Sequence, residues 1–285
     1  MGGGMTGTLF CFGLGYSAEV LARRLAAQGW AIRGTTRRPE KAERLAGQGW
    51  RLWPFDRARP LPPEALAGAT HALVSIAPDE AGDPVLDLHG RDLRDTRWIG
   101  WLGTTAVYGN RQGGWVDETT PIEPSLARAD RRAKAEAAWL ASGLPVHLFR
   151  LAGIYGPGRN AFVSLKDGTA RRIVKPGQVF SRIHVEDIAT VLEASIARPR
   201  PGAIYNVCDD EPAPPQDVVT YAAQLAGVDP PPEQPYDTAD LSPMARTFYR
   251  DNRRVRNELI KRELGVTLAF PSYREGLAAL RPVDG

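Results

Sequence analysis

This chain of 285 residues has few cysteines, and it lacks clustered histidines and long hydrophobic stretches. Only Cys11 and Cys208 occur, which rules out a disulfide framework, so we expect a reducing, cytoplasmic setting. No apolar run reaches the length of about 18 residues that a membrane-spanning helix needs, so we expect no membrane partner. His71, His89 and His147 are isolated in the sequence, and no cluster of ligand-type residues suits a metal, so we expect no metal site.

A strong excess of one charge is lacking too. The formal net charge is only +3, with 24% charged and 43% hydrophobic residues, as in an ordinary globular protein. Arg250, Arg253, Arg254 and Arg256 form the densest basic cluster. We interpret them as the exposed, partner-contacting face of a helix, and we expect no nucleic-acid partner.

The chain opens on a glycine-containing turn between a predicted strand and a predicted helix. The apolar run Leu9–Phe12 leads into Gly13 and Gly15, an amphipathic helix follows, and Ala31–Thr36 reads as a second strand. Gly13 permits a tight turn, Gly15 lets a pyrophosphate approach the backbone, and Ala18 allows close packing of helix on sheet. The helix start offers N–H groups and partial positive charge to phosphates. The pattern favours a dinucleotide site over a plain strand-to-helix turn.

The residues at the end of the second strand help to distinguish an NAD site from an NADP site. An NAD site usually carries Asp or Glu about 20 residues past the glycines, to bind the ribose 2′-hydroxyl. Here Gly34–Thr36 is followed by Arg37 and Arg38. A guanidinium can bind a 2′-phosphate, so we predict NADP as the preferred cofactor, with NAD as the alternative. A solvated basic helix start, with Pro39 at its first turn, is the other interpretation.

Predicted strands and helices alternate as far as about residue 150, which favours an α/β fold with a Rossmann-type, doubly wound parallel sheet. We expect residues 1–150 to form the dinucleotide-binding domain. Residues 151–285, richer in irregular loops, should form mostly a smaller C-terminal substrate lobe, with some elements returning to the sheet. The later helices are expected at Val185–Ala197, Pro215–Ala226 and Asn252–Glu263.

Four further segments give the chain a family resemblance. They are Thr104–Gly109 (TTAVYG), Phe149–Asn160 (FRLAGIYGPGRN), Arg182–Ala189 (RIHVEDIA) and Tyr205–Val207 (YNV). In this order they resemble segments of the extended short-chain dehydrogenase/reductases, the NAD-dependent epimerase/dehydratase group. The resemblance runs from Phe12 to about Leu280. It implies a tyrosine that exchanges a proton with the substrate, a lysine one helical turn later, and an upstream Ser or Thr on the substrate oxygen.

The chain departs from that catalytic pattern on the helix expected at 127–142, which contains no tyrosine. In the family a glutamate commonly follows the lysine by four positions. Anchoring on Glu136 places Arg132 at the lysine position and Arg128 at the tyrosine position, whereas another register would pair Asp130 with Lys134. Arg132 can still bind ribose hydroxyls, but Arg128 cannot act as a proton donor or base, because a guanidinium stays charged.

The upstream hydroxyl position falls on Thr104, with its neighbour Thr105 as the alternative. Tyr108 and Tyr155 could substitute for the missing tyrosine, although both match segments that are usually structural in the family. With the glycine turn, the expected cofactor contacts are Gly13, Leu14, Gly15, Tyr16, Ser17, Thr36, Arg37, Arg38, Phe55, Asp56, Ser75, Ile76, Ala77, Arg132, Gly153, Ile154 and Tyr155.

The expected substrate-facing residues are Tyr108, Arg159, Asn160 and His184. Arg159 and Asn160 could equally fasten a loop, and His184 could simply join a strand end to a helix start.

Two functions fit the sequence. One is an NADP-dependent oxidoreductase or epimerase/dehydratase-like enzyme acting on a small polar substrate, for example one that resembles a sugar nucleotide. The other is a cofactor-binding sensor or regulatory protein without turnover, favoured by the missing tyrosine. The family often pairs through helices equivalent to 127–142, so we expect a monomer or a homodimer.

Overall fold

The computed structural model describes residues 6–281, and these divide into two compact units. The first unit comprises the chain up to Thr104 together with Asp130–Arg150 and Ala189–Tyr205. The second comprises Thr105–Ala129, Leu151–Ile188 and the chain from Asn206 onward. The division therefore does not follow a single boundary near residue 150, because the chain passes between the units several times.

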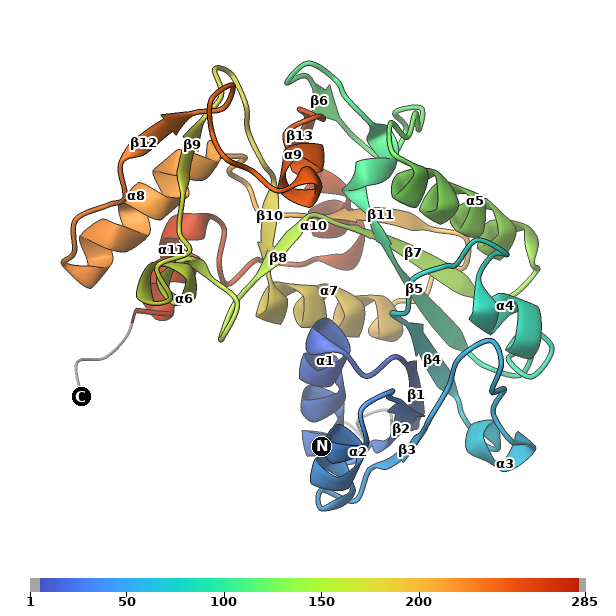
Figure 1. The fold of residues 1–285 in the computed structure, drawn as a ribbon. Helices are drawn as coiled ribbons and strands as arrows, with labels where there is room; N and C mark the ends of the chain where they lie inside the picture. The colour runs from blue at the N-terminus through green and yellow to red at the C-terminus, as the bar shows by residue number, and fades with distance from the viewer. Residues whose placement is uncertain (1–5, 282–285) are drawn as a thin grey trace. The chain divides into compact units, whose positions relative to one another are not determined.

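A seven-stranded sheet is the centre of the first unit, with strand order β11-β7-β5-β4-β1-β2-β3 (Figure 1). The pairs β1–β2, β1–β4, β2–β3 and β4–β5 are parallel. The direction of strand progression reverses beside β1, which makes a topological switch point where ligands bind in open α/β sheets. The strands are β1 (Thr8–Phe12), β2 (Ala31–Thr35), β3 (Arg51–Trp53), β4 (His71–Val74), β5 (Trp98–Thr104), β7 (Val146–Leu151) and β11 (Ile204–Val207).

Helices connect these strands, which confirms the predicted α/β class with its doubly wound sheet. They are α1 (Tyr16–Ala27), α2 (Pro39–Ala46), α3 (Pro63–Leu66), α4 (Pro84–His89), α5 (Ala127–Ala141) and α7 (Val185–Ala197). Helix α1 buries Ala18, Leu21 and Ala22 completely, and its small residues allow the close approach to the sheet that the sequence predicted. A core cluster of the unit includes Phe10 and Trp139.

The second unit contains short strands and helices. Its strands pair two by two, as β10–β8, β12–β9 and β13–β6. Helix α8 packs with α6 and α11 around Phe162, Ala222 and Leu277. The elements are η1 (Thr105–Tyr108), β6 (Trp115–Val116), β8 (Gly153–Tyr155), α6 (Ala161–Lys166), β9 (Arg172–Val174), β10 (Arg182–His184), α8 (Pro215–Ala226), β12 (Glu233–Pro235), α9 (Pro243–Phe248), β13 (Arg254–Val255), α10 (Glu258–Leu264) and α11 (Tyr273–Ala279).

The helix predicted at Asn252–Glu263 is wrong in its first half. Residues there form strand β13, which pairs with β6, and α10 begins only at Glu258. Arg253 donates through Nη1 to the Gly109 carbonyl at 2.9 Å, and Arg254 donates to the Gly113 carbonyl. These arginines therefore bind backbone oxygens of their own unit, instead of lining the exposed face of a helix.

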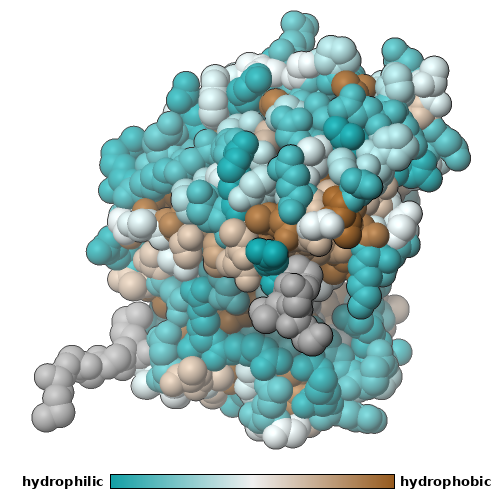
Figure 2. All heavy atoms as spheres, turned by 90° about the vertical axis from the view of Figure 1, so that its left-hand side faces the viewer, coloured by the Kyte–Doolittle hydropathy of each residue, from teal (hydrophilic) through white to brown (hydrophobic). Residues whose placement is uncertain are grey.

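Within residues 6–281, no helix combines the length and apolar character needed to cross a bilayer. Hydrophilic residues cover most of the face drawn in Figure 2, and the hydrophobic ones gather there in a few groups. Leu140 of α5 is one of the exposed large hydrophobic residues, with 39% of its surface accessible.

Glu19 joins helix α1 to helix α2. Its carboxylate lies 2.7 Å from Nζ of Lys41, 2.7 Å from Nη2 of Arg23 and 2.9 Å from Nη2 of Arg44. Burial alone would raise the pKa of this carboxyl, but the hydrogen bonds from the three cations outweigh it and lower the pKa to about 2.

A Glu19→Gln variant should therefore lose about 1 kcal/mol of unfolding free energy at pH 7, a modest amount because the cluster is partly solvated. The folded pKa lies below the ordinary value of 4.5. The stabilisation is thus complete above that value and is lost as the pH falls toward about 2. Urea unfolding at several pH values measures this. An equal deficit at neutral and strongly acidic pH would contradict the assignment, and Glu40→Gln, on the exposed start of α2, is the control.

Candidate functional site

The turn between β1 and α1 is fixed from the end of β2. The Gly13 amide donates to Oγ1 of Thr35 at 2.7 Å, and the Leu14 amide donates to the Thr35 carbonyl at 2.8 Å. Gly13 has a φ of +84°, in the left-handed region that favours glycine. Thr35 thus sets the path of the backbone as it leaves β1.

The end of β4 fixes the same turn from the other side. Ser75 donates through Oγ to the Gly13 carbonyl and, at 3.3 Å, to the Phe12 carbonyl. A Cβ on Gly13 would lie 2.5 Å from Cγ2 of Ile76, so any larger residue at position 13 would clash with the Ile76 side chain. The turn is therefore held between two strand ends.

Gly15 presents bare backbone at the start of α1. A Cβ placed on it would meet only the Gly13 carbonyl oxygen, at 3.9 Å, so the space beside Gly15 is open. Gly15 is also the N-cap of α1, and no side chain caps the helix there. An uncapped helix start with open space beside it is the arrangement that accepts phosphate oxygens.

This turn lines a cavity of about 660 Å³ in the first unit, a size typical of small-molecule sites. The lining residues come from the carboxyl ends of β1, β2, β3 and β4 and from the segments that follow them. They are Gly13, Leu14, Gly15, Thr35, Thr36, Arg37, Arg38, Phe55, Asp56, Arg57, Ser75, Ile76, Ala77, Asp79 and Pro84. The structure thus brings together most of the cofactor contacts predicted from the sequence.

The sequence did not predict four of the residues that line the cavity: Thr35, Arg57, Asp79 and Pro84. Thr35 stood inside the segment considered for ribose binding, and Arg57 follows Asp56 directly, so position alone could have suggested both. Asp79 gave no local signal, because its place depends on an ion pair with another loop.

Three arginines line the cavity, and only Arg57 forms ion pairs with other side chains of the described residues. Arg37 and Arg38 are exposed, and no hydrogen bond or ion pair among the described residues engages their guanidinium groups. Arg57, in contrast, pairs with Asp79 and with Asp87. The positive charge available to an anionic ligand in this cavity therefore comes from the two residues just before α2.

Helix α5 carries the two arginines that stand at the family's catalytic positions. Arg132 donates through Nη1 to the Leu102 carbonyl of β5 at 3.1 Å. Burial lowers the pKa of its guanidinium, and the charge of Asp83 acts in the opposite direction. The other register, Asp130 with Lys134, forms an exposed ion pair of 2.8 Å, with the Lys134 side chain 76% exposed. The inward-facing residue is therefore Arg132.

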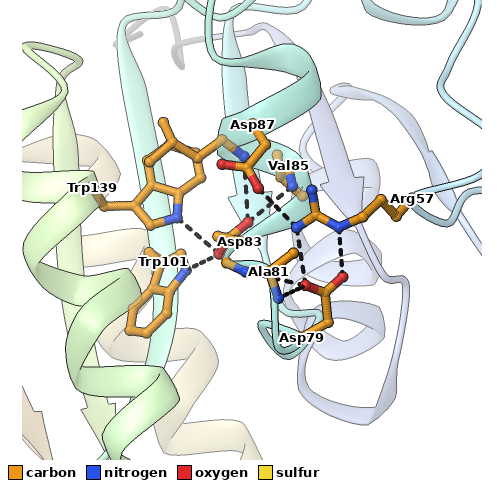
Figure 3. Close-up of polar contacts among 10 residues, drawn as sticks. Arg57, Asp79, Ala81, Asp83, Val85, Asp87, Trp101 and Trp139 are labelled. Atoms are coloured by element: carbon orange, nitrogen blue, oxygen red, sulfur yellow. Dashed lines mark hydrogen bonds and ion pairs between the residues drawn. The ribbon is translucent and has the colours of Figure 1, made fainter.

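Asp83 ties helix α5 to strand β5 and to the loop after β4. Its Oδ2 accepts the indole N–H groups of Trp101 and Trp139, each at 2.9 Å, and its Oδ1 accepts the Val85 amide at 2.9 Å (Figure 3). Asp83 is 3% exposed, so these donors replace its hydration. The carboxylate thus holds three segments of the first unit in register.

Arg128, in the first turn of α5, lies in the second unit and contacts two residues of helix α9. Its guanidinium is 4.9 Å from the ring centroid of Phe248, and Nη1 lies 2.9 Å from the sulfur of Met244. A guanidinium in this setting can bind an anion or stack on a ring, but it cannot take up a proton.

The tyrosines considered as substitutes for the missing one are engaged in structural contacts. Tyr108 is fully buried and donates to Oδ1 of Asn206 at 2.8 Å. Tyr155 donates to the Ser272 carbonyl at 3.3 Å. Burial, together with Asp209 and Asp187, raises the pKa of Tyr155 above its ordinary value. Because both hydroxyls donate their protons to structural partners, neither is placed to act as a base toward a substrate near neutral pH.

The remaining predicted residues lie outside the cavity lining. Thr104 ends β5 and Thr105 begins η1, while Gly153, Ile154 and Tyr155 form β8 in the second unit. Tyr16 and Ser17 belong to the first turn of α1, with Ser17 buried.

The other predicted substrate residues have roles within the second unit. Asn160 caps α6 by accepting the Val163 amide at 3.2 Å, and Arg159 is exposed in the turn before it. His184 ends β10, and its ring packs 4.0 Å from that of Phe270. No group of three or more His, Cys, Asp or Glu side chains among residues 6–281 is arranged to hold a metal ion.

Comparison with known proteins places the chain among its relatives. No family model matches it. Over 237 residues it is 30% identical to Protein YeeZ of Escherichia coli (strain K12), a match covering 77% of this chain and 84% of that protein. The chain belongs to the YeeZ family. A functionally unknown conserved protein from Silicibacter pomeroyi DSS is 56% identical, with a TM-score of 0.89 over 96% of this chain and 98% of that one.

The fold of this YeeZ-family protein is also that of a well-known enzyme group. The dTDP-glucose 4,6-dehydratase of Bacillus anthracis, solved with NAD, superposes with a TM-score of 0.77 over 96% of this chain and 94% of that one, at 17% identity. The predicted resemblance to the NAD-dependent epimerase/dehydratase group is thereby confirmed at the level of the fold.

We predict that Asp83→Ala lowers the unfolding free energy of this YeeZ-family protein by about 3 kcal/mol, because two buried indole N–H groups lose their acceptor. Chemical denaturation followed by circular dichroism measures the loss. Asp95→Ala, at an exposed position in the same unit, should stay within about 0.5 kcal/mol of the wild type. Equal stability of both variants would show that Asp83 does not hold the segments together.

Proposed function

We propose that the first unit binds a nicotinamide dinucleotide, with NADP preferred over NAD. The observation that carries the proposal is the glycine turn, held by Thr35 and Ser75, whose bare backbone opens into the cavity. The pyrophosphate would lie against Gly15 and the start of α1. The similar dehydratase structure that contains NAD supports this class of ligand.

The preference for NADP rests on Arg37 and Arg38. Both guanidinium groups are exposed at the cavity, in the place where an NAD site usually has a carboxylate. Each could bind the 2′-phosphate without giving up an internal partner. Arg57 is excluded from this role in the proposal, because Asp79 and Asp87 already balance its charge.

We further propose that the protein is an oxidoreductase or epimerase/dehydratase-like enzyme for a small polar substrate. The bound cofactor would supply hydride transfer. Arg132 would hold the nicotinamide ribose and supply positive charge, and Thr104 or Thr105 would donate a hydrogen bond to the substrate oxygen. The two buried thiols, Cys11 and Cys208, fit a reducing compartment, so the proposal places the enzyme in the cytoplasm.

A second candidate function is a cofactor-binding sensor without turnover. It is favoured by Arg128 at the tyrosine position and by the structural hydrogen bonds of Tyr108 and Tyr155. Incubation with NADPH and a panel of carbonyl compounds and nucleotide sugars separates the two candidates. Oxidation of NADPH by one of them supports the enzyme, whereas tight binding without turnover of any of them supports the sensor.

Replacing Arg37 and Arg38 together by serine should weaken NADPH binding at least about tenfold and leave NADH binding nearly unchanged, because charge-assisted hydrogen bonds to the 2′-phosphate are lost. Calorimetric titration measures both affinities. Arg91→Ser, at an exposed position of the same unit, should leave NADPH binding unchanged. Tighter binding of NADH than of NADPH by the wild type would refute the preference.

Replacing Arg132 by alanine should weaken NADPH binding about fivefold or more, since the residue would no longer bind ribose hydroxyls. Lys134→Ala is the matched control from the alternative register, because that side chain lies in solvent. A loss of affinity in the Lys134 variant, with none in the Arg132 variant, would reverse the assignment.

A further inference from the structure

An ion-paired arginine spans the carboxyl end of the sheet beside the proposed dinucleotide cavity. Arg57 follows β3, while Asp79 follows β4, and β1 and β2 lie between these strands in the sheet. Three strand spacings amount to roughly 14 Å. Even so, Nε of Arg57 lies 2.7 Å from Oδ2 of Asp79. The two loops therefore meet over the ends of β1 and β2.

Both loops are tight turns that fix their charged residues. Asp56 and Arg59 exchange backbone hydrogen bonds, with Arg57 between them. On the other side, Oδ1 of Asp79 accepts the Ala81 amide at 2.9 Å and the Gly82 amide at 3.1 Å. The positions of the guanidinium and the carboxylate are thus set by local backbone before they meet.

The bonds to Arg57 lie at the edge of its guanidinium. Asp79 accepts from Nε at 2.7 Å and from Nη2 at 3.0 Å, and Oδ2 of Asp87 lies 2.7 Å from Nη2 (Figure 3). A Cβ on Gly82 would lie only 3.2 Å from Oδ2 of Asp87, so the loop passes close to this carboxylate. N–H groups donate in the plane of a guanidinium, so such bonds orient the plane and leave its faces for stacking.

Resting on the proposed function, we propose that the Arg57 guanidinium, held in its plane by Asp79 and Asp87, is the surface on which the adenine ring of the dinucleotide stacks. Arg57 lines the cavity next to Phe55 and Asp56, and its side chain is 33% exposed. An edge-bonded guanidinium suits a flat, electron-rich purine.

The charges support a division of roles within the cavity. Two carboxylates face Arg57, so the platform offers no net positive charge to phosphate. Arg37 and Arg38 provide that charge from another segment. The contribution of Arg57 should therefore be insensitive to salt, whereas that of Arg37 and Arg38 should weaken as salt is added.

The test is Arg57→Lys, which keeps the positive charge beside both carboxylates but removes the planar face. Dissociation constants for NADPH and for 2′,5′-ADP, which carries adenine and the 2′-phosphate without nicotinamide, are measured at low and high salt. We expect both ligands to bind about tenfold more weakly to the variant, by a factor that salt does not change. Arg59→Lys, in the same turn but outside the cavity lining, should bind as the wild type does.

Binding of both ligands to Arg57→Lys within about twofold of the wild type would overturn the inference and leave the proposed function standing. A loss of affinity that disappears at high salt would also overturn it, because it would assign Arg57 to phosphate binding. Failure of the wild type to bind either ligand would instead refute the proposed function itself. A thermal melt of each variant verifies that it is folded at the assay temperature.

Discussion

The backbone turn at Gly13 is the constraint on which the candidate site depends. Thr35 binds its amide from the end of β2, and Ser75 binds its carbonyl from the end of β4. These two strands flank β1 in the sheet, so the order of the strands brings both side chains to the same turn. The left-handed conformation of Gly13 then directs the chain into α1, and Gly15 is left with open space beside its backbone.

Charged groups around this turn divide into paired and unpaired sets. Glu19 gathers three cations between α1 and α2, and Asp79 and Asp87 engage Arg57. These pairs hold secondary-structure elements and loops together. Arg37 and Arg38 are exposed at the cavity, and no hydrogen bond or ion pair among the described residues engages their guanidinium groups. The same residue type therefore serves structure in one place and is available for recognition in another.

Local sequence pattern was sufficient to predict the turn after β1 and several residues that line the cavity. The spacing of Gly13 and Gly15 between a strand and a helix predicted the turn, and Phe55–Asp56 and Ser75–Ala77 were placed correctly at the cavity because they follow parallel strands. Anchoring on Glu136 placed Arg132 at the lysine position, and this assignment stays a prediction. In the structure, Glu136 forms a buried ion pair with Arg150.

Long-range contacts account for what the sequence did not reveal. The pairing of Arg57 with Asp79 joins two loops across the sheet, and no short-range pattern encodes it. The arginines near residue 253 suggested a helix, yet the structure uses them to bind carbonyls of Gly109 and Gly113 while β13 pairs with β6. Asp83 is the N-cap of α4, and its two indole donors come from residues 18 and 56 positions further along the chain.

The central claim is that dinucleotide phosphates lie against the backbone at the start of α1. Amide hydrogen exchange of the protein with and without saturating NADPH tests it most directly. We predict slower exchange in the first turn of α1 on binding, with little change in the amides of α8 in the second unit. Binding of NADPH with unchanged exchange at the start of α1 would contradict the account.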